Sequence, residues 1–97
     1  MDIDVNEIGR NGYKLLQSNG VVPEKEVKEL SIKERKELVA KIESMCADVL
    51  YRKVTEKNEN RFENIHKYNF LIFLYSSIIT YLENTDLNKF INIKPKN

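Results

Sequence analysis

Residues 68–82 read YNFLIFLYSSIITYL, a run of fifteen residues without a charge in a 97-residue chain of which 32% is charged. A membrane span needs about 20 apolar residues, whereas this run is shorter and contains four polar side chains, Asn69, Ser76, Ser77 and Thr80. The run is also longer than a typical strand of about 5 or 6 residues, although Phe, Ile, Tyr and Thr all favour strands. It therefore predicts a buried helix.

The predicted helix is apolar over most of its circumference. At about 100° per residue, its polar side chains gather on one narrow stripe, formed by Asn69, Ser76, Thr80 and Glu83, with His66, Ser77 and Asn84 beside it. The remaining apolar arc exceeds the roughly 100° face of an ordinary surface helix, so other elements must cover it on several sides. The pattern predicts either the central helix of a bundle or a helix that meets a second molecule.

A second long helix is predicted immediately before it. Ser31 and Glu34 have the spacing of a capping box, and an amphipathic run follows, which predicts a helix over about 32–57. Its apolar residues recur at three- and four-residue spacing: Ile32, Leu38, Val39, Ile42, Met45, Cys46, Val49, Leu50 and Val54. The polar residues 55–60 form the turn that reverses the chain into the helix 61–84.

The N-terminal segment is less regular. Asp4 and Glu7 have the form of a capping box, and an apolar edge extends to about Ser18 through Val5, Ile8, Leu15 and Leu16. Gly9 and Gly12 count against a regular helix here, because a Gly in a helix interior costs about 0.5–1 kcal/mol relative to Ala.

Short elements are predicted on either side of the two long helices. Gly20 suits a left-handed position, and Pro23 begins two helical turns over 23–30 with Val27 and Leu30 pointing inward. After residue 84, a short terminal helix carries Leu87, Phe90 and Ile91 and ends before Pro95.

Together these patterns predict an all-α fold, a small antiparallel bundle of three to five helices around a central apolar helix over 61–84. The pair 32–57 and 61–84 forms the frame, and the N-terminal segment packs across it. We expect residues 1–97 to form a single helical domain with a short basic tail at 94–97. A domain of this size buries only about 60–65% of its unfolded surface, so its stability is modest without a partner.

Charge and residue inventory argue against several classes of function. Sixteen Lys and Arg against fifteen Asp and Glu give a net charge of +1, so no bulk attraction to nucleic acid or acidic lipid is expected. One His and one Cys do not supply the three or four ligands of a zinc site, and we expect no metal or cofactor. The lone Cys46, read as a buried and inert thiol, and the lack of a signal-like N-terminal segment favour the cytoplasm.

A short motif lies at the start of the predicted central helix. Arg61, His66 and Tyr68 have the Arg-x4-His-x-Tyr spacing and resemble the motif of the HepT toxins, dimeric helical ribonucleases of the HEPN superfamily. The resemblance spans eight residues and implies that Arg61 stabilises the charge of the phosphorane while His66 transfers a proton during RNA cleavage. It also implies that Tyr68 is the tyrosine modified by a partner antitoxin. The alternative is a partly exposed His at a helix start beside an ordinary surface Arg.

The leading hypothesis is a small, non-enzymatic helical protein–protein interaction module, such as a phage or mobile-element accessory factor, an inhibitor or an immunity-type protein. It rests on two features, the lack of a catalytic constellation outside the short motif and an apolar helix too wide for short neighbours to cover. The same width predicts a protein partner of unknown identity and a homodimer. The alternatives are the HepT-like ribonuclease and a DNA-associated helical regulator, although the sequence shows no helix-turn-helix spacing.

Overall fold

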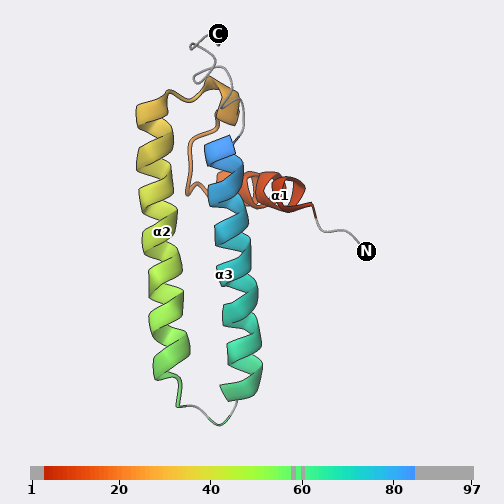
Figure 1. Ribbon diagram of the computed structural model, residues 1–97, viewed down its shortest axis with the longest axis vertical. Helices are drawn as coiled ribbons and strands as arrows, with labels where there is room; N and C mark the ends of the chain where they lie inside the picture. The colour runs from red at the N-terminus through yellow and green to blue at the C-terminus, as the bar shows by residue number, and fades with distance from the viewer. Residues whose placement is uncertain (1–3, 58, 60, 85–97) are drawn as a thin grey trace, which may run out of the picture.

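A computed structural model describes residues 4–57, 59 and 61–84 of the chain (Figure 1). Within these residues it contains three α-helices, α1 (Val5–Ser18), α2 (Ile32–Thr55) and α3 (Arg61–Asn84), and one short 3-10 helix, η1 (Val27–Glu29). The described part of the chain contains no strand, which confirms the predicted all-α class. The predicted terminal helix with Leu87, Phe90 and Ile91, and the tail 94–97, lie outside the described residues.

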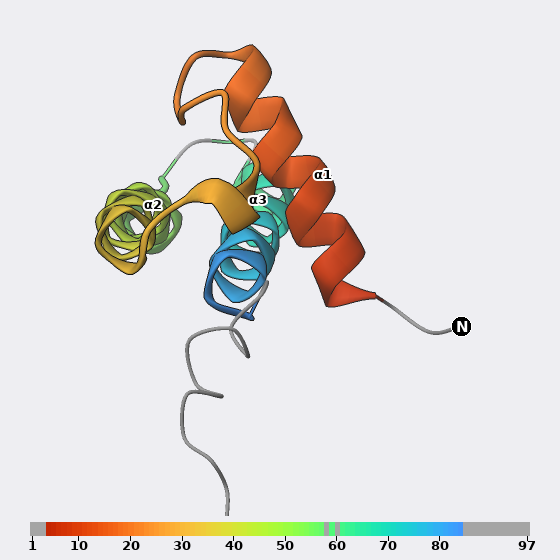
Figure 2. The same cartoon turned by 90° about the horizontal axis from the view of Figure 1, so that it is seen from above.

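The two long helices form an antiparallel hairpin, and α1 crosses α3 near the end where α3 finishes (Figures 1 and 2). Helix α3 packs against both α1 and α2. The bounds of α2 and α3 agree closely with the predicted ranges 32–57 and 61–84, and the arrangement has the predicted frame with the N-terminal segment across it.

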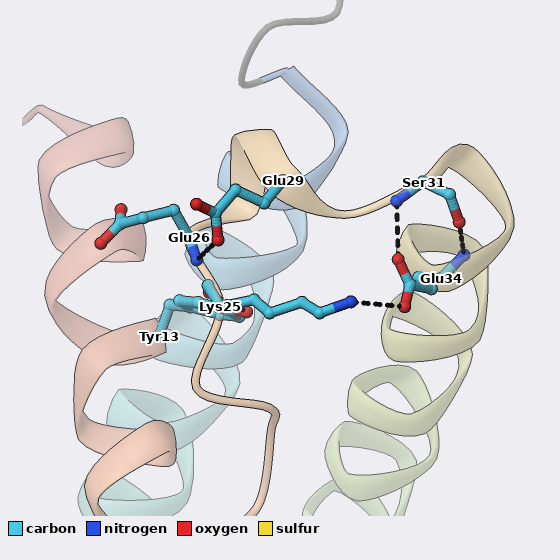
Figure 3. A network of polar contacts seen from close by, with 6 residues as sticks. All are labelled: Tyr13, Lys25, Glu26, Glu29, Ser31 and Glu34. Carbon is cyan, nitrogen blue, oxygen red and sulfur yellow. Dashed lines mark hydrogen bonds and ion pairs between the residues drawn. The ribbon is translucent and has the colours of Figure 1, made fainter.

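The start of α2 is held by side chains that satisfy its free backbone groups. The Ser31 hydroxyl accepts a hydrogen bond from the Glu34 backbone N–H at 3.0 Å, and the Glu34 carboxylate accepts one from the Ser31 N–H at 2.8 Å. This is the predicted capping box (Figure 3). The Lys25 ammonium lies 3.1 Å from the other Glu34 oxygen, so the loop before α2 is tied to the first turn of the helix.

Helix α1 is one regular helix, contrary to the expectation from its glycines. Gly9 and Gly12 are both buried, and they face α3 at very close range. A Cβ atom on Gly9 would lie 2.2 Å from the backbone oxygen of Ser77, and one on Gly12 would lie 2.7 Å from Cδ1 of Ile78. The absence of side chains at these two positions lets the helices approach each other, and this packing offsets the low helix propensity of Gly.

The buried side of α1 also differs from the predicted apolar edge. Of the predicted edge, Leu16 is buried and Ile8 is half-buried, but Leu15 is 53% exposed and Val5 is 37% exposed. Tyr13, which the predicted edge did not include, is buried beside the two glycines. The edge was predicted from large apolar side chains alone. Because the contact with α3 is made through glycines, the buried side is shifted around the helix toward Tyr13 while it still includes Leu16.

The segment between α1 and α2 contains less helix than predicted. Residues 23–26 are not helical, and only the single turn η1 forms. Two carbonyl groups of this segment accept hydrogen bonds from α1 instead of from their own helix. The Tyr13 hydroxyl donates to the Lys25 oxygen at 3.1 Å, and the Gln17 amide donates to the Pro23 oxygen at 3.1 Å and the Lys25 oxygen at 3.0 Å.

Other predictions for this segment are confirmed. Val27 and Leu30 point inward, with exposures of 1% and 2%. Gly20 has a φ of 75°, the left-handed backbone conformation that the sequence predicts there.

The core lies at the end of the hairpin that α1 crosses. Its buried apolar side chains come from all three helices and the connecting segment: Tyr13, Leu16, Val22, Val27, Leu30, Leu38, Ile42, Ile78 and Leu82. Arg35, only 6% exposed, joins three of these parts. Its guanidinium donates to the Val27 oxygen at 2.8 Å and to the Leu82 oxygen at 3.4 Å, which links α2 to η1 and to the last turn of α3.

Candidate interaction surface on the helical hairpin

The half of the hairpin away from α1 has little cover. The segment 61–76 of α3 contains no buried residue, whereas Ser77, Ile78 and Leu82 further along the same helix are buried. Six large apolar side chains at least 41% exposed lie on this half of the hairpin: Leu50, Tyr51, Val54, Phe62, Phe70 and Phe73. This half of the molecule therefore presents apolar surface to its surroundings.

At the opposite end of the hairpin, one edge of α2 and one edge of α3 line the same groove, so these two edges lie on one face of the molecule. The groove is lined by Ile32 and Val39 of α2 together with Leu82 and Glu83 of α3. Both edges can then be followed along the helices, because residues separated by whole helical turns lie on the same side.

We name this surface the open face and define it by residues from both helices: Ile32, Val39, Leu50 and Val54 of α2, and Ile65, Asn69, Ile72, Ser76 and Ile79 of α3. On α3, these five residues lie within about 80° of one another at 100° per residue. Ile65, Ile72 and Ile79 are half-buried, while Asn69 and Ser76 between them are exposed.

The spacing of the α3 residues on the open face is that of a helix–helix contact. From Ile65 to Ile79 the positions alternate by four and three residues, and the three isoleucines recur every seven residues. This 3-4 alternation is the one by which the contact positions of coiled coils recur. The polar stripe with Asn69 and Ser76 predicted the exposed side, and the seven-residue recurrence of isoleucine is the further signal in the sequence that marks this side as a helix contact.

Charged side chains stand near both ends of the open face on α3. Arg61 is exposed at the first position of α3, with its guanidinium 5.6 Å from the centre of the Phe62 ring. Glu83 is exposed near the last turn and borders the groove. At 100° per residue, both lie within about 20° of Ile72, so the α3 edge of the open face runs from a positive to a negative residue. On α2, Lys36 and Glu43 line the same groove as Glu83.

The three residues of the ribonuclease-like motif lie in different surroundings. His66 is exposed, as is Arg61, and the two are about 140° apart around α3. Tyr68 is half-buried, and its hydroxyl donates to the Glu56 carboxylate at 3.4 Å. The Asn64 amide donates to the same Glu56 oxygen, so Tyr68 helps to fix the turn between α2 and α3.

Two pKa shifts mark the junction of α1, the connecting segment and α2. Burial raises the pKa of Tyr13 above its usual value of 10.0, and the nearby Tyr81 acts in the same direction. The hydrogen bond from the Ser31 backbone lowers the pKa of Glu34 below 4.5, as does its bond with Lys25. Both groups support the fold.

The sequence places Cys46 on the inner side of α2, and the structure finds it half-buried. Among the described residues, no group of three or more His, Cys, Asp or Glu side chains could hold a metal ion. No helix in the described ranges is long and apolar enough to cross a membrane.

Comparisons of the chain with protein-family models, with curated proteins and with solved structures find no match. The candidate surface therefore rests on the burial, spacing and charge of its own residues.

Proposed function

We propose that the chain is a small, non-enzymatic protein–protein interaction module and that its open face binds the partner protein. The observation that carries this proposal is the segment 61–76, in which nine of sixteen residues are apolar or aromatic and none is buried. Exposed apolar side chains gathered on one half of a small protein mark a site of association with another protein.

The interaction module acts in the cytoplasm as an accessory factor of a phage or mobile element, as an inhibitor or as an immunity-type protein. Such a protein works by occupying a surface of its target and needs no catalytic group. The proposal includes a homodimer, because one chain leaves Ile32, Leu50 and Val54 of the open face exposed. Association that covers apolar surface is favoured by roughly 25 cal/mol per Å² before the entropy cost of association is subtracted.

The experiment is light scattering of the purified protein at high micromolar concentration, beside two variants of α3. Ile72→Glu places a charge in the centre of the open face, and we expect it to be monomeric while the wild type associates. Lys67→Glu is the matched control, because Lys67 is exposed on the same helix but about 140° away from Ile72. Circular dichroism shows whether both variants keep the helical fold. A wild-type protein that is strictly monomeric, with no partner present, would refute the homodimer.

A ribonuclease resembling the HepT toxins is the second candidate function. It is favoured by the exposure of Arg61 and His66 at the start of α3, where both side chains are accessible to an RNA substrate. Because the two side chains diverge within one chain, a shared site needs a second chain to bring the groups together.

A further inference from the structure

We infer that the open face pairs with the open face of a second copy of this chain, with the two α3 helices antiparallel about a two-fold axis near Ile72. This inference rests on the proposed function, since it specifies the partner and the geometry of the surface proposed to bind protein. A two-fold pairing uses the same surface on both chains, so it covers the open face of each and leaves none for further copies.

The side chains of the open face match in this arrangement. With the axis near Ile72, that residue meets the partner's Ile72, and Ile65 meets the partner's Ile79. Asn69 lies beside the partner's Ser76, where the amide can donate to the hydroxyl oxygen. Polar side chains therefore face polar side chains, and apolar side chains face apolar ones. Asn69 and Ser76, which are exposed in one chain, gain hydrogen-bond partners in the dimer.

Charge determines the relative direction of the two helices. Arg61 and Glu83 are separated by 22 residues, which correspond to about 33 Å along the helix axis. In the antiparallel arrangement each Arg61 lies beside the partner's Glu83, so two opposite-charge pairs form. A parallel pairing would bring Arg61 beside the partner's Arg61 and Glu83 beside the partner's Glu83. Like charges in contact disfavour that orientation, while the exposed ion pairs add little to affinity itself.

Disulfide cross-linking tests the geometry. In a Cys46→Ser background, a tagged Asn69→Cys chain is mixed with an untagged Ser76→Cys chain and oxidised. The antiparallel arrangement offsets residue 69 from the partner's residue 76 by about 1.5 Å along the axis, but it offsets residue 69 from the partner's residue 69 by about 9 Å. Because a disulfide needs Cα atoms about 4.4–6.8 Å apart, we expect the mixed disulfide to form in preference to either self-disulfide.

The outcomes separate this inference from the proposal on which it rests. Strong self-disulfides of both chains would show a parallel pairing, and they would overturn the antiparallel geometry while the protein-binding surface stands. Association without any of these disulfides would place the contact on another face and would also overturn the inference. A monomer would overturn both the inference and the proposed homodimer, and would assign the open face to a different protein.

A charge exchange gives a second, independent test. Arg61→Glu and Glu83→Arg each place like charges together in the antiparallel dimer, so each should raise the dimer dissociation constant by up to about tenfold. The double variant Arg61→Glu with Glu83→Arg again places opposite charges together, so its dimer dissociation constant should return to near the wild-type value. Lys67→Glu, which changes the charge outside the open face, should leave it unchanged. If the double variant is weaker than both single variants, Arg61 and Glu83 do not pair between chains.

Discussion

Replacing Gly9 with Ala tests the close packing of α1 on α3. Ala favours the helix over Gly by about 0.5–1 kcal/mol, so the substitution would stabilise an exposed helix. Here the new Cβ would lie 2.2 Å from the Ser77 oxygen and 2.7 Å from Cβ of Tyr81, well inside the about 3.5–4.0 Å of ordinary contact. The Ser77 oxygen belongs to the α3 backbone, so it cannot move aside alone. Overpacking costs about 1–3 kcal/mol, and we expect a net loss of about 1–2 kcal/mol in the free energy of unfolding.

Urea unfolding followed by circular dichroism measures this loss. Asn11→Ala is the matched control, because Asn11 is exposed on the same helix and its replacement should stabilise the protein by about 0.5 kcal/mol through helix propensity. Gly12→Ala should cost less than Gly9→Ala, since its nearest contact is the movable end of the Ile78 side chain. A Gly9→Ala variant as stable as the wild type would refute the packing of α1 on α3 described above.

Three further predictions concern the buried cation, the response to alkali and the ribonuclease alternative. Arg35→Ala should lower the free energy of unfolding by about 2–3 kcal/mol, because two buried carbonyls lose a charged donor. In the same urea titration, replacing the exposed Arg52 with Ala should cost less than about 0.5 kcal/mol. Because the pKa of Tyr13 is raised in the folded protein, the unfolded chain releases this proton first as the pH rises. The free energy of unfolding should therefore fall as the pH rises above 10.0. Urea midpoints measured across alkaline pH should show a smaller fall for Tyr13→Phe. The purified protein should not degrade RNA; if it does, and His66→Ala and Arg61→Ala each lose about 10²–10⁴ in rate while melting normally, the ribonuclease reading replaces the interaction module.

The hairpin could be predicted from the sequence because its signals are local. The Ser31 and Glu34 pair lies within one helical turn, and the long apolar run 68–82 excludes most alternatives to a helix. The fold of the N-terminal segment depends on contacts between residues far apart in the chain. Gly9 reads as a helix breaker by propensity, and only its approach to Ser77 shows why a glycine is needed there.

The same distinction applies to the surface. The width of the apolar arc predicted that a helix of this kind needs cover, and the polar stripe of Asn69, Ser76 and Glu83 predicted its uncovered side, but neither showed where that side ends. That depends on where α1 and α2 pack, which leaves Asn69 and Ser76 exposed but buries Ser77 at 1% exposure. Ser77 was predicted to lie beside the polar stripe, and it is buried because Gly9 packs against its backbone while its hydroxyl donates to the Phe73 oxygen at 2.9 Å.

The central claim, that association covers the open face, is tested most directly by the melting temperature as a function of protein concentration. A partner that binds only the folded state raises the melting temperature by mass action. We expect the wild-type melting temperature to rise steadily with concentration, and that of Ile72→Glu to stay constant. A wild-type melting temperature that does not change with concentration would contradict the account.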